Sequence, residues 1–239
     1  MDAPLPQCAG LLPRLNLSGP PESVHPTERC FATMKQQKMR VVQCWDDGHQ
    51  NDIPLCDVLR LHGAKASFNL NAANMDQPGK ALAQKPDVFD GFTIANHSLT
   101  HPSLDKVPIE KARTDIVEGR KRLQDRFGTP VLGFAYPNGT YNPAVMELLR
   151  EAGHVYGRTV TNVEQCFPPQ DPMAFHPNCH FLAPDFWTRF ERARACGVFY
   201  FWGHSYEIKT PEMWAAFDAQ IARISADPAA VWAELISLF

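Results

Sequence analysis

The sequence contains no long hydrophobic run, no block of basic residues and no closely paired cysteines, and each absence excludes a class of protein. No apolar run reaches the roughly 18 residues that a membrane-spanning helix needs. The chain carries 23 Lys and Arg against 26 Asp and Glu, for a net charge of −3. Because the basic residues do not cluster, neither a nucleic acid nor an anionic membrane surface is an expected partner.

The N-terminus and the cysteines bear on the cellular location. The first ten residues lack the basic segment and the roughly 7–15-residue apolar core of a secretory signal. The seven cysteines include no CxxC pair, so neither a structural zinc knuckle nor a thioredoxin-like site is predicted. They are Cys8, Cys30, Cys44, Cys56, Cys166, Cys179 and Cys196. These features predict a cytoplasmic location, and a mature secreted form without its signal would show the same pattern.

Length and composition indicate a globular chain with an irregular start. The 239 residues, 44% hydrophobic and 21% charged, suffice for one large α/β domain with a proper core or for two small domains. Residues 1–39 contain prolines and show no periodic pattern, so we expect an irregular N-terminal arm. We expect residues 40–239 to form one folded domain.

Beyond residue 39, short apolar segments of strand length alternate with segments of helical period. Strands are predicted at residues 41–45, 66–70, 92–95, 131–134, 155–160 and 198–202, and helices at 53–62, 108–127, 143–151, 185–196 and 211–225. Residues 161–184 are predicted to be irregular, and 231–239 fit either a strand or a helix. The alternation predicts a parallel sheet, open or closed into a barrel, and six or seven strands suit the count.

The residues best suited to chemistry stand where a predicted strand passes into a loop. Asp46 and Asp47 follow the first strand, His97 and His101 follow the third, and His204 follows the last. The carboxyl ends of parallel strands share one edge of a sheet or barrel, and active sites of such folds lie there. We therefore expect these side chains to converge.

The two adjacent aspartates reach a common site only under one condition. Side chains on a regular strand alternate between faces, so Asp46 and Asp47 converge only if the backbone turns sharply. Gly48 follows them directly and permits such a turn. Taken alone, Asp-Asp-Gly is more often an ordinary polar turn.

The two histidines suit a shared metal ion. His97 and His101 are four residues apart, and two imidazoles at this spacing can each bind one zinc ion at about 2.0–2.1 Å. Pro102 disfavours helical backbone at His101, so we expect an irregular turn. With Asp47 the pair makes a two-histidine, one-carboxylate set, which holds either iron for oxygen chemistry or a divalent ion that activates water. The βα alternation favours hydrolysis.

Four short motifs occur in a recognisable order: CWDDG at residues 44–48, HSLTH at 97–101, AYPNG at 135–139 and WGHS at 202–205. In order and spacing they resemble the motifs of the polysaccharide deacetylases, the NodB-homology group, also called carbohydrate esterase family 4. The similarity spans about residues 40–225. It implies that residues 40–239 form a catalytic domain folded as a distorted (β/α) barrel of about seven parallel strands.

The resemblance also implies roles for individual residues. Asp46 corresponds to the family's catalytic base, and His204 corresponds to its general acid. Asp47, His97 and His101 correspond to the ligands of one divalent metal ion. Zinc is the expected ion, with cobalt, manganese or nickel as alternatives.

The third motif departs from the family pattern. Ala135 stands where the family has an arginine that orients the base, and we hypothesise that Arg158, after the following strand, supplies the missing charge. Asn138 replaces an aromatic residue, and its backbone N–H is expected to bind the oxyanion. Further substrate contacts are expected from Tyr136, His180, Trp202 and Tyr206. Trp45 and Trp202, at strand ends, also fit core positions.

The sequence thus predicts a metal-dependent deacetylase that removes N- or O-acetyl groups from an acetylated sugar or oligosaccharide. One alternative is a catalytically silent carbohydrate-binding relative, in which the loss of the arginine has disabled the base. The other is a ferrous-iron oxygenase. The sequence does not specify the sugar, the type of acetyl bond or the length of the substrate. It does not specify the oligomeric state either.

Overall fold

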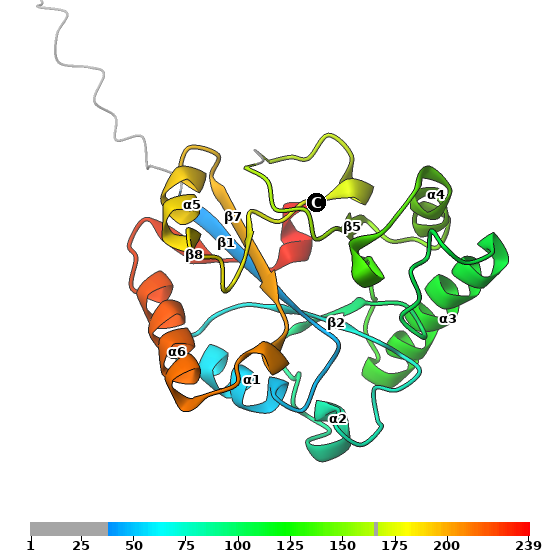
Figure 1. The fold of residues 1–239 in the computed structure, drawn as a ribbon, viewed down its shortest axis with the longest axis horizontal. Helices are drawn as coiled ribbons and strands as arrows, with labels where there is room; N and C mark the ends of the chain where they lie inside the picture. The colour runs from blue at the N-terminus through cyan, green and yellow to red at the C-terminus, as the bar shows by residue number, and fades with distance from the viewer. Residues whose placement is uncertain (1–37, 165–166) are drawn as a thin grey trace, which may run out of the picture. The chain divides into compact units, whose positions relative to one another are not determined.

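The computed structural model describes residues 38–164 and 167–239 (Figure 1). The predicted irregular arm at residues 1–39 lies outside the described residues except for its last two, and it stays a prediction. The first strand begins at Met39, one residue before the expected start of the folded domain.

Within these two described ranges, eight strands form one sheet. They are β1 (Met39–Asp46), β2 (Ser67–Leu70), β3 (Thr93–Asn96), β4 (Gly133–Ala135), β5 (Tyr156–Arg158), β6 (Cys179–His180), β7 (Val198–Gly203) and β8 (Ala230–Trp232). Their order is β5-β4-β3-β2-β1-β7-β6, with β8 also paired to β1. Every pair is parallel. The short strand β8 and the longer β2 share one edge of β1, at its start and its end respectively.

The segment that follows β5 partly bridges the two ends of the sheet. Phe175 forms an isolated parallel bridge with Arg158 of β5, at one end of the sheet. Strand β6, only a few residues later, pairs with β7 near the other end. The sheet therefore curls toward closure through one irregular segment. The predicted distorted barrel of about seven parallel strands is confirmed. Residues 231–239, which fit either a strand or a helix, contain the end of β8 and a 3₁₀ turn at residues 235–238.

Helices connect most of the strands and lie outside the sheet (Figure 1). They are α1 (Asp52–Leu61), α2 (Ala81–Gln84), α3 (Ile109–Phe127), α4 (Pro143–Glu151), α5 (Phe186–Ala193) and α6 (Pro211–Ser225), with 3₁₀ turns η1 (Pro137–Gly139), η2 (Pro172–Ala174), η3 (Ser205–Glu207) and η4 (Leu235–Leu238). The sequence missed α2 and β6, because elements this short carry no periodic signal. None of the helices in the described part of the chain is long and apolar enough to cross a membrane.

The central strand β1 is buried on both faces, as expected for a parallel strand covered by helices. Val41, Val42, Cys44 and Trp45 are all fully buried. The Trp45 ring packs edge-on against Phe181, Phe201 and Phe217, with ring centroids 5.0, 6.5 and 5.3 Å away. The expected core position of Trp45 is confirmed. This packing anchors the strand whose last residue is Asp46.

Candidate active site

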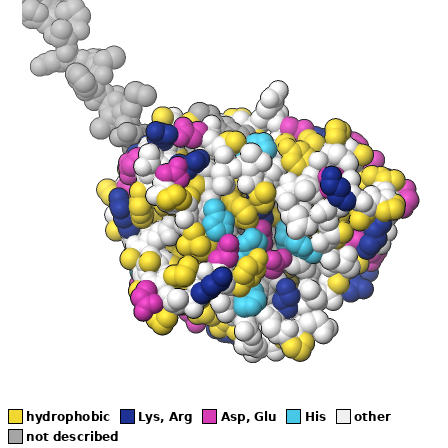
Figure 2. All heavy atoms as spheres, in the orientation of Figure 1, with side chains coloured by type: hydrophobic (Ala, Val, Ile, Leu, Met, Phe, Trp, Pro, Cys, Tyr) yellow, Lys and Arg dark blue, Asp and Glu magenta, His cyan; other side chains and the backbone are white. Residues whose placement is uncertain are grey.

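The carboxyl ends of β1, β3, β4 and β7 surround one pocket of about 300 Å³. It is lined by Asp46, Asp47, His97, His101, Tyr136, Asn138, Val160, Trp202, His204 and Tyr206. Figure 2 shows histidine and acidic side chains gathered in the middle of one face of the molecule. A larger depression of about 450 Å³ between α5 and α6 is mostly apolar, with Arg223 as its one ionisable lining residue. Volume alone therefore does not identify the site.

A sharp backbone turn brings the two aspartates to the same pocket. Asp46 ends β1, and the turn begins at Asp47 itself, whose φ is 76°, before Gly48 with a φ of 62°. The Asp47 N–H donates to the Asn69 carbonyl at 3.0 Å, and the Lys80 ammonium donates to the Asp47 carbonyl at 2.7 Å. The predicted turn is present, although the left-handed conformation starts one residue before the glycine.

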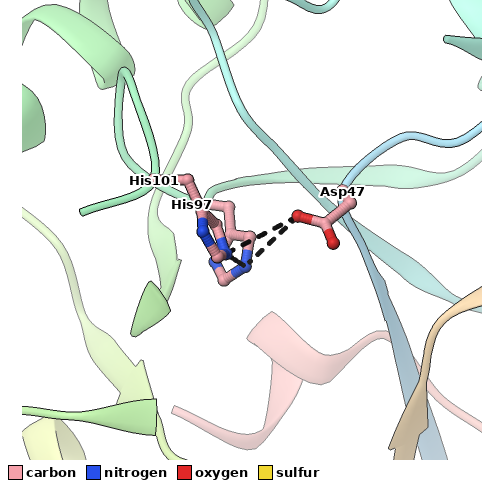
Figure 3. A group of neighbouring side chains, drawn as sticks. All are labelled: Asp47, His97 and His101. Atoms are coloured by element: carbon pink, nitrogen blue, oxygen red, sulfur yellow. Dashed lines mark hydrogen bonds and ion pairs between the residues drawn. The ribbon is translucent and has the colours of Figure 1, made fainter. Parts of the chain in front are cut away.

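The two histidines meet through an irregular turn after β3, as Pro102 suggested. Ser98 and His101 both have left-handed backbone, with φ values of 65° and 63°. The Nε2 atoms of His97 and His101 lie 3.1 Å apart, and each is 3.7 Å from Oδ1 of Asp47 (Figure 3). Two nitrogen ligands of one zinc ion are separated by about 3 Å. The spacing of the three side chains therefore suits a single divalent ion.

Hydrogen bonds to the ligands support the same interpretation. His97 Nδ1 donates to the Ala135 carbonyl at 2.8 Å, which leaves the Nε2 lone pair free to face Asp47 and His101. Burial lowers the pKa of His97 to about 4, so its imidazole is neutral at pH 7, as a metal ligand requires. The Asn71 amide donates to Asp47 Oδ1 at 2.7 Å and orients that carboxylate.

Arg158 reaches the first aspartate from the strand next to Ala135. Ala135 and Arg158 are direct partners in the register of β4 and β5. The Arg158 Nη2 donates to both carboxylate oxygens of Asp46, at 2.5 Å to Oδ1, and the Asn69 amide donates to Oδ1 at 2.7 Å. Burial alone would raise the pKa of Asp46, but Arg158 and the neighbouring histidines outweigh it and hold the pKa well below its usual range. Asp46 is therefore ionised.

His204 faces both aspartates from the end of β7. Its Nε2 lies 3.9 Å from Oδ2 of Asp46 and 3.9 Å from Oδ2 of Asp47. Its Nδ1 lies 3.2 Å from Oε2 of Glu207, which also accepts a hydrogen bond from the His204 backbone N–H at 3.0 Å. Burial opposes protonation, but the hydrogen bond to Glu207 prevails and raises the pKa of His204 above its ordinary value.

Glu207 was not identified from the sequence, although its spacing carries a signal. A glutamate three residues after a histidine at a helix start can accept from that histidine's backbone N–H, as a capping box does in the turn η3. Glu207 also accepts a hydrogen bond from His180 Nε2 at 2.9 Å. His180, a predicted substrate contact, therefore points to Glu207 and is not among the residues that line the pocket. Its contact with substrate stays a prediction.

The side chains of the other predicted substrate contacts differ in their exposure to solvent. Tyr136 is fully buried and its hydroxyl donates to the Met173 carbonyl at 2.8 Å. The Trp202 ring is half-buried: it packs against the core and also lines the pocket, with the Arg158 guanidinium 5.0 Å from its centroid. Tyr206 is 39% exposed and stacks on His204, with centroids 4.8 Å apart. Asn138 has a φ of 57° and its amide donates to Ser103 at 3.0 Å.

Comparison with known proteins identifies the family. Residues 33–157, just over half of the chain, match the family described as Polysaccharide deacetylase, so the chain belongs to this family. It is 27% identical over 130 residues to a chitooligosaccharide deacetylase of Azorhizobium caulinodans, a match that covers 51% of this chain and 59% of that protein. It is 30% identical over 98 residues to a peptidoglycan-N-acetylglucosamine deacetylase of Bacillus cereus, covering 41% and 45%. The matches span less than two thirds of these relatives.

Solved structures of carbohydrate esterase family 4 share the fold. A pseudoenzyme of this family from Bacillus anthracis superposes with a TM-score of 0.60 at 16% identity, over 85% of this chain and 66% of that one. A family 4 carbohydrate esterase from Streptomyces lividans, in complex with acetate, gives 0.57 at 17% identity, over 82% and 92%. The same architecture therefore occurs in a carbohydrate esterase and in a pseudoenzyme, so the fold alone does not show activity.

Proposed function

We propose that this protein is a metal-dependent hydrolase that removes N- or O-acetyl groups from a sugar or oligosaccharide. One observation carries the proposal: three potential ligands, Asp47, His97 and His101, share a pocket with an ionised carboxylate, Asp46, and a histidine of raised pKa, His204. A metal site, a base and an acid are the groups that hydrolysis of an acetyl bond requires.

The first part of the proposal concerns the metal. Asp47, His97 and His101 would hold one divalent ion, and two imidazoles with one carboxylate favour zinc, with cobalt, manganese or nickel able to replace it. When bound, such an ion lowers the pKa of an adjacent water molecule and polarises an acetyl carbonyl. The Nε2 lone pair of His97 is available for this role because its Nδ1 is already bonded to the Ala135 carbonyl.

The second part concerns the base. Asp46, ionised beside Arg158, accepts a proton from the attacking water as the water adds to the acetyl carbonyl. Arg158 holds the carboxylate in one orientation and takes the place of the arginine that family relatives carry at the position of Ala135. Its support is the paired contact between the guanidinium and both oxygens of Asp46 across neighbouring strands.

The third part concerns the departing group and the developing negative charge. His204, whose pKa Glu207 raises, donates a proton to the leaving amine or alcohol. The backbone N–H of Asn138, in its left-handed turn at the pocket wall, is the proposed donor to the oxyanion. The exposed ring of Tyr206 and the half-buried ring of Trp202 offer apolar faces to a sugar.

A direct test combines metal loading with acetate release. The full chain is stripped with a chelator, reloaded with zinc, and assayed on N-acetylated chitooligosaccharides and on an O-acetylated xylooligosaccharide. We expect zinc-dependent acetate release from at least one substrate, slowed by at least about 100-fold in the Asp46→Asn variant. Sugar binding without release would instead support a silent carbohydrate-binding relative. Ferrous-dependent oxygen uptake would support the oxygenase alternative.

A further inference from the structure

One face of helix α3 contacts the turn that carries His97 and His101. The Asn96 amide donates to the Ile116 carbonyl at 2.9 Å, and the Leu99 N–H donates to the Asp115 carbonyl at 2.9 Å. Gly119 allows this close approach, because a Cβ there would lie only 2.8 Å from the carbonyl carbon of Ser98. The turn therefore rests directly on the helix, with no space for a side chain between them.

Asp115 is the one carboxylate of α3 that is buried against this turn. Its Oδ1 accepts two hydrogen bonds of 2.7 Å from Thr100, one from the backbone N–H and one from the hydroxyl. Its Oδ2 is paired with the ammonium of Lys111. The Asp115 side chain is fully buried, and Thr100 is the residue immediately before His101.

The turn needs such an anchor because its backbone is unfavourable. Two of its non-glycine residues, Ser98 and His101, adopt left-handed backbone, which persists only where surrounding structure holds it. His101 is also less enclosed than its partner: its side chain is 33% exposed, against 2% for His97. Packing fixes His97, whereas His101 depends on the shape of the turn.

We propose that Asp115 is a positioning residue for metal binding: by holding both donors of Thr100 it fixes the left-handed turn that brings His101 Nε2 to within 3.1 Å of His97 Nε2. The proposal rests on the proposed function, since it assumes that these two nitrogens share an ion. Asp115 does not contact the ion. Lys111 assists by neutralising the buried charge of Asp115.

The same helix supplies a matched control. Lys121 and Asp125 repeat the Lys111–Asp115 spacing, but both are about two-thirds exposed and 3.4 Å apart at the surface. Asp115→Ala and Asp125→Ala therefore each remove a lysine-paired carboxylate from the same helix, one buried and one exposed. The zinc affinity of each full-length, metal-free variant is measured by competition with a chromophoric chelator, and the visible spectrum of the cobalt-loaded protein reports ligand geometry.

We expect Asp115→Ala to raise the zinc Kd by about 10- to 100-fold, the usual effect of losing an outer partner of a metal ligand, and to change the cobalt spectrum. Asp125→Ala should stay within about twofold, as expected for an exposed pair. Asp115→Asn keeps an oxygen acceptor for Thr100 and should recover part of the affinity. A general loss of stability would not produce this order or alter the spectrum of the folded protein.

Three outcomes overturn the proposal. Unchanged zinc affinity and an unchanged cobalt spectrum in a folded Asp115→Ala variant would refute it while leaving the proposed function intact. No zinc binding by the unmodified chain would refute both. If Asp115→Ala does not fold, Thr100→Val removes one of the two donors and is compared with Thr114→Val, whose hydroxyl bonds only to the Glu110 carbonyl of its own helix. Equal zinc affinities of these two variants would likewise refute it.

Discussion

The two sides of the pocket are constructed by different means. On the side of the proposed metal site, called the metal side, Asp47 and His101 have left-handed backbone, and hydrogen bonds from Lys80 and to Asp115 hold the turns that contain them. On the proton-transfer side, Asp46 and His204 have extended backbone at strand ends. Charged partners control that second pair: Arg158 for Asp46 and Glu207 for His204. Backbone turns set the positions of the proposed ligands, whereas charged partners shift the pKa values of the proposed base and acid.

The largest effect is expected from removing a proposed ligand on the metal side of the pocket. His101→Ala removes one of three proposed ligands, so we expect zinc to be lost during gel filtration and acetate release to fall to background. Metal content by elemental analysis checks this result. His62→Ala, which alters a histidine paired with Asp218 away from the pocket, should retain the full zinc content.

Asp46→Asn should impair proton transfer without impairing metal binding. We expect kcat to fall by about 10²- to 10⁴-fold, the usual contribution of a general base, with the zinc Kd nearly unchanged. Steady-state kinetics and zinc titration of the same preparation measure the two quantities. A parallel loss of zinc affinity would show that Asp46 belongs to the metal side, so the metal side and the proton-transfer side would not be separate.

A smaller effect is expected at the arginine. Arg158→Ala leaves the buried Asp46 without its charge partner, so we expect kcat/KM to fall by about 10- to 100-fold. Loss of one member of a buried pair also lowers the free energy of unfolding, by about 3–5 kcal/mol, which urea titration measures. Because Ala135 is the register partner of Arg158, adding Ala135→Arg should restore part of kcat/KM. Unchanged kcat/KM in the single variant would end the hypothesis that Arg158 replaces the family arginine.

The smallest effect is a shift in pH dependence. The proposed acid must be protonated, so activity is lost as pH rises through the pKa of His204, which Glu207 raises above its ordinary value. Glu207→Gln removes the negative charge and should move the alkaline limb of the kcat profile to lower pH. An unmoved limb with lowered kcat would mean that Glu207 only orients the ring.

Much of the fold could be predicted from local patterns. Helices 143–151 and 211–225 occur as predicted because proline at the first helical position, and side-chain caps from Asn142 and Thr210, define their starts. Strand β5 is shorter than its predicted span: its pairing with β4 ends at Arg158, and beyond it the Thr159 N–H donates to the Phe175 carbonyl of the irregular segment. Boundaries that depend on such distant partners leave no local signal.

The sequence by itself determined which chemical groups reach the pocket: the motif order, the strand ends at which they stand, and the pair of histidines four residues apart. Only the tertiary structure decided their states and supports. It placed Arg158 beside Ala135, bonded His180 to Glu207 and seated Thr100 on Asp115. The physical reason is that spacing along a strand or turn is a local property, whereas an ion pair or buried hydrogen bond depends on which distant segments the sheet brings together.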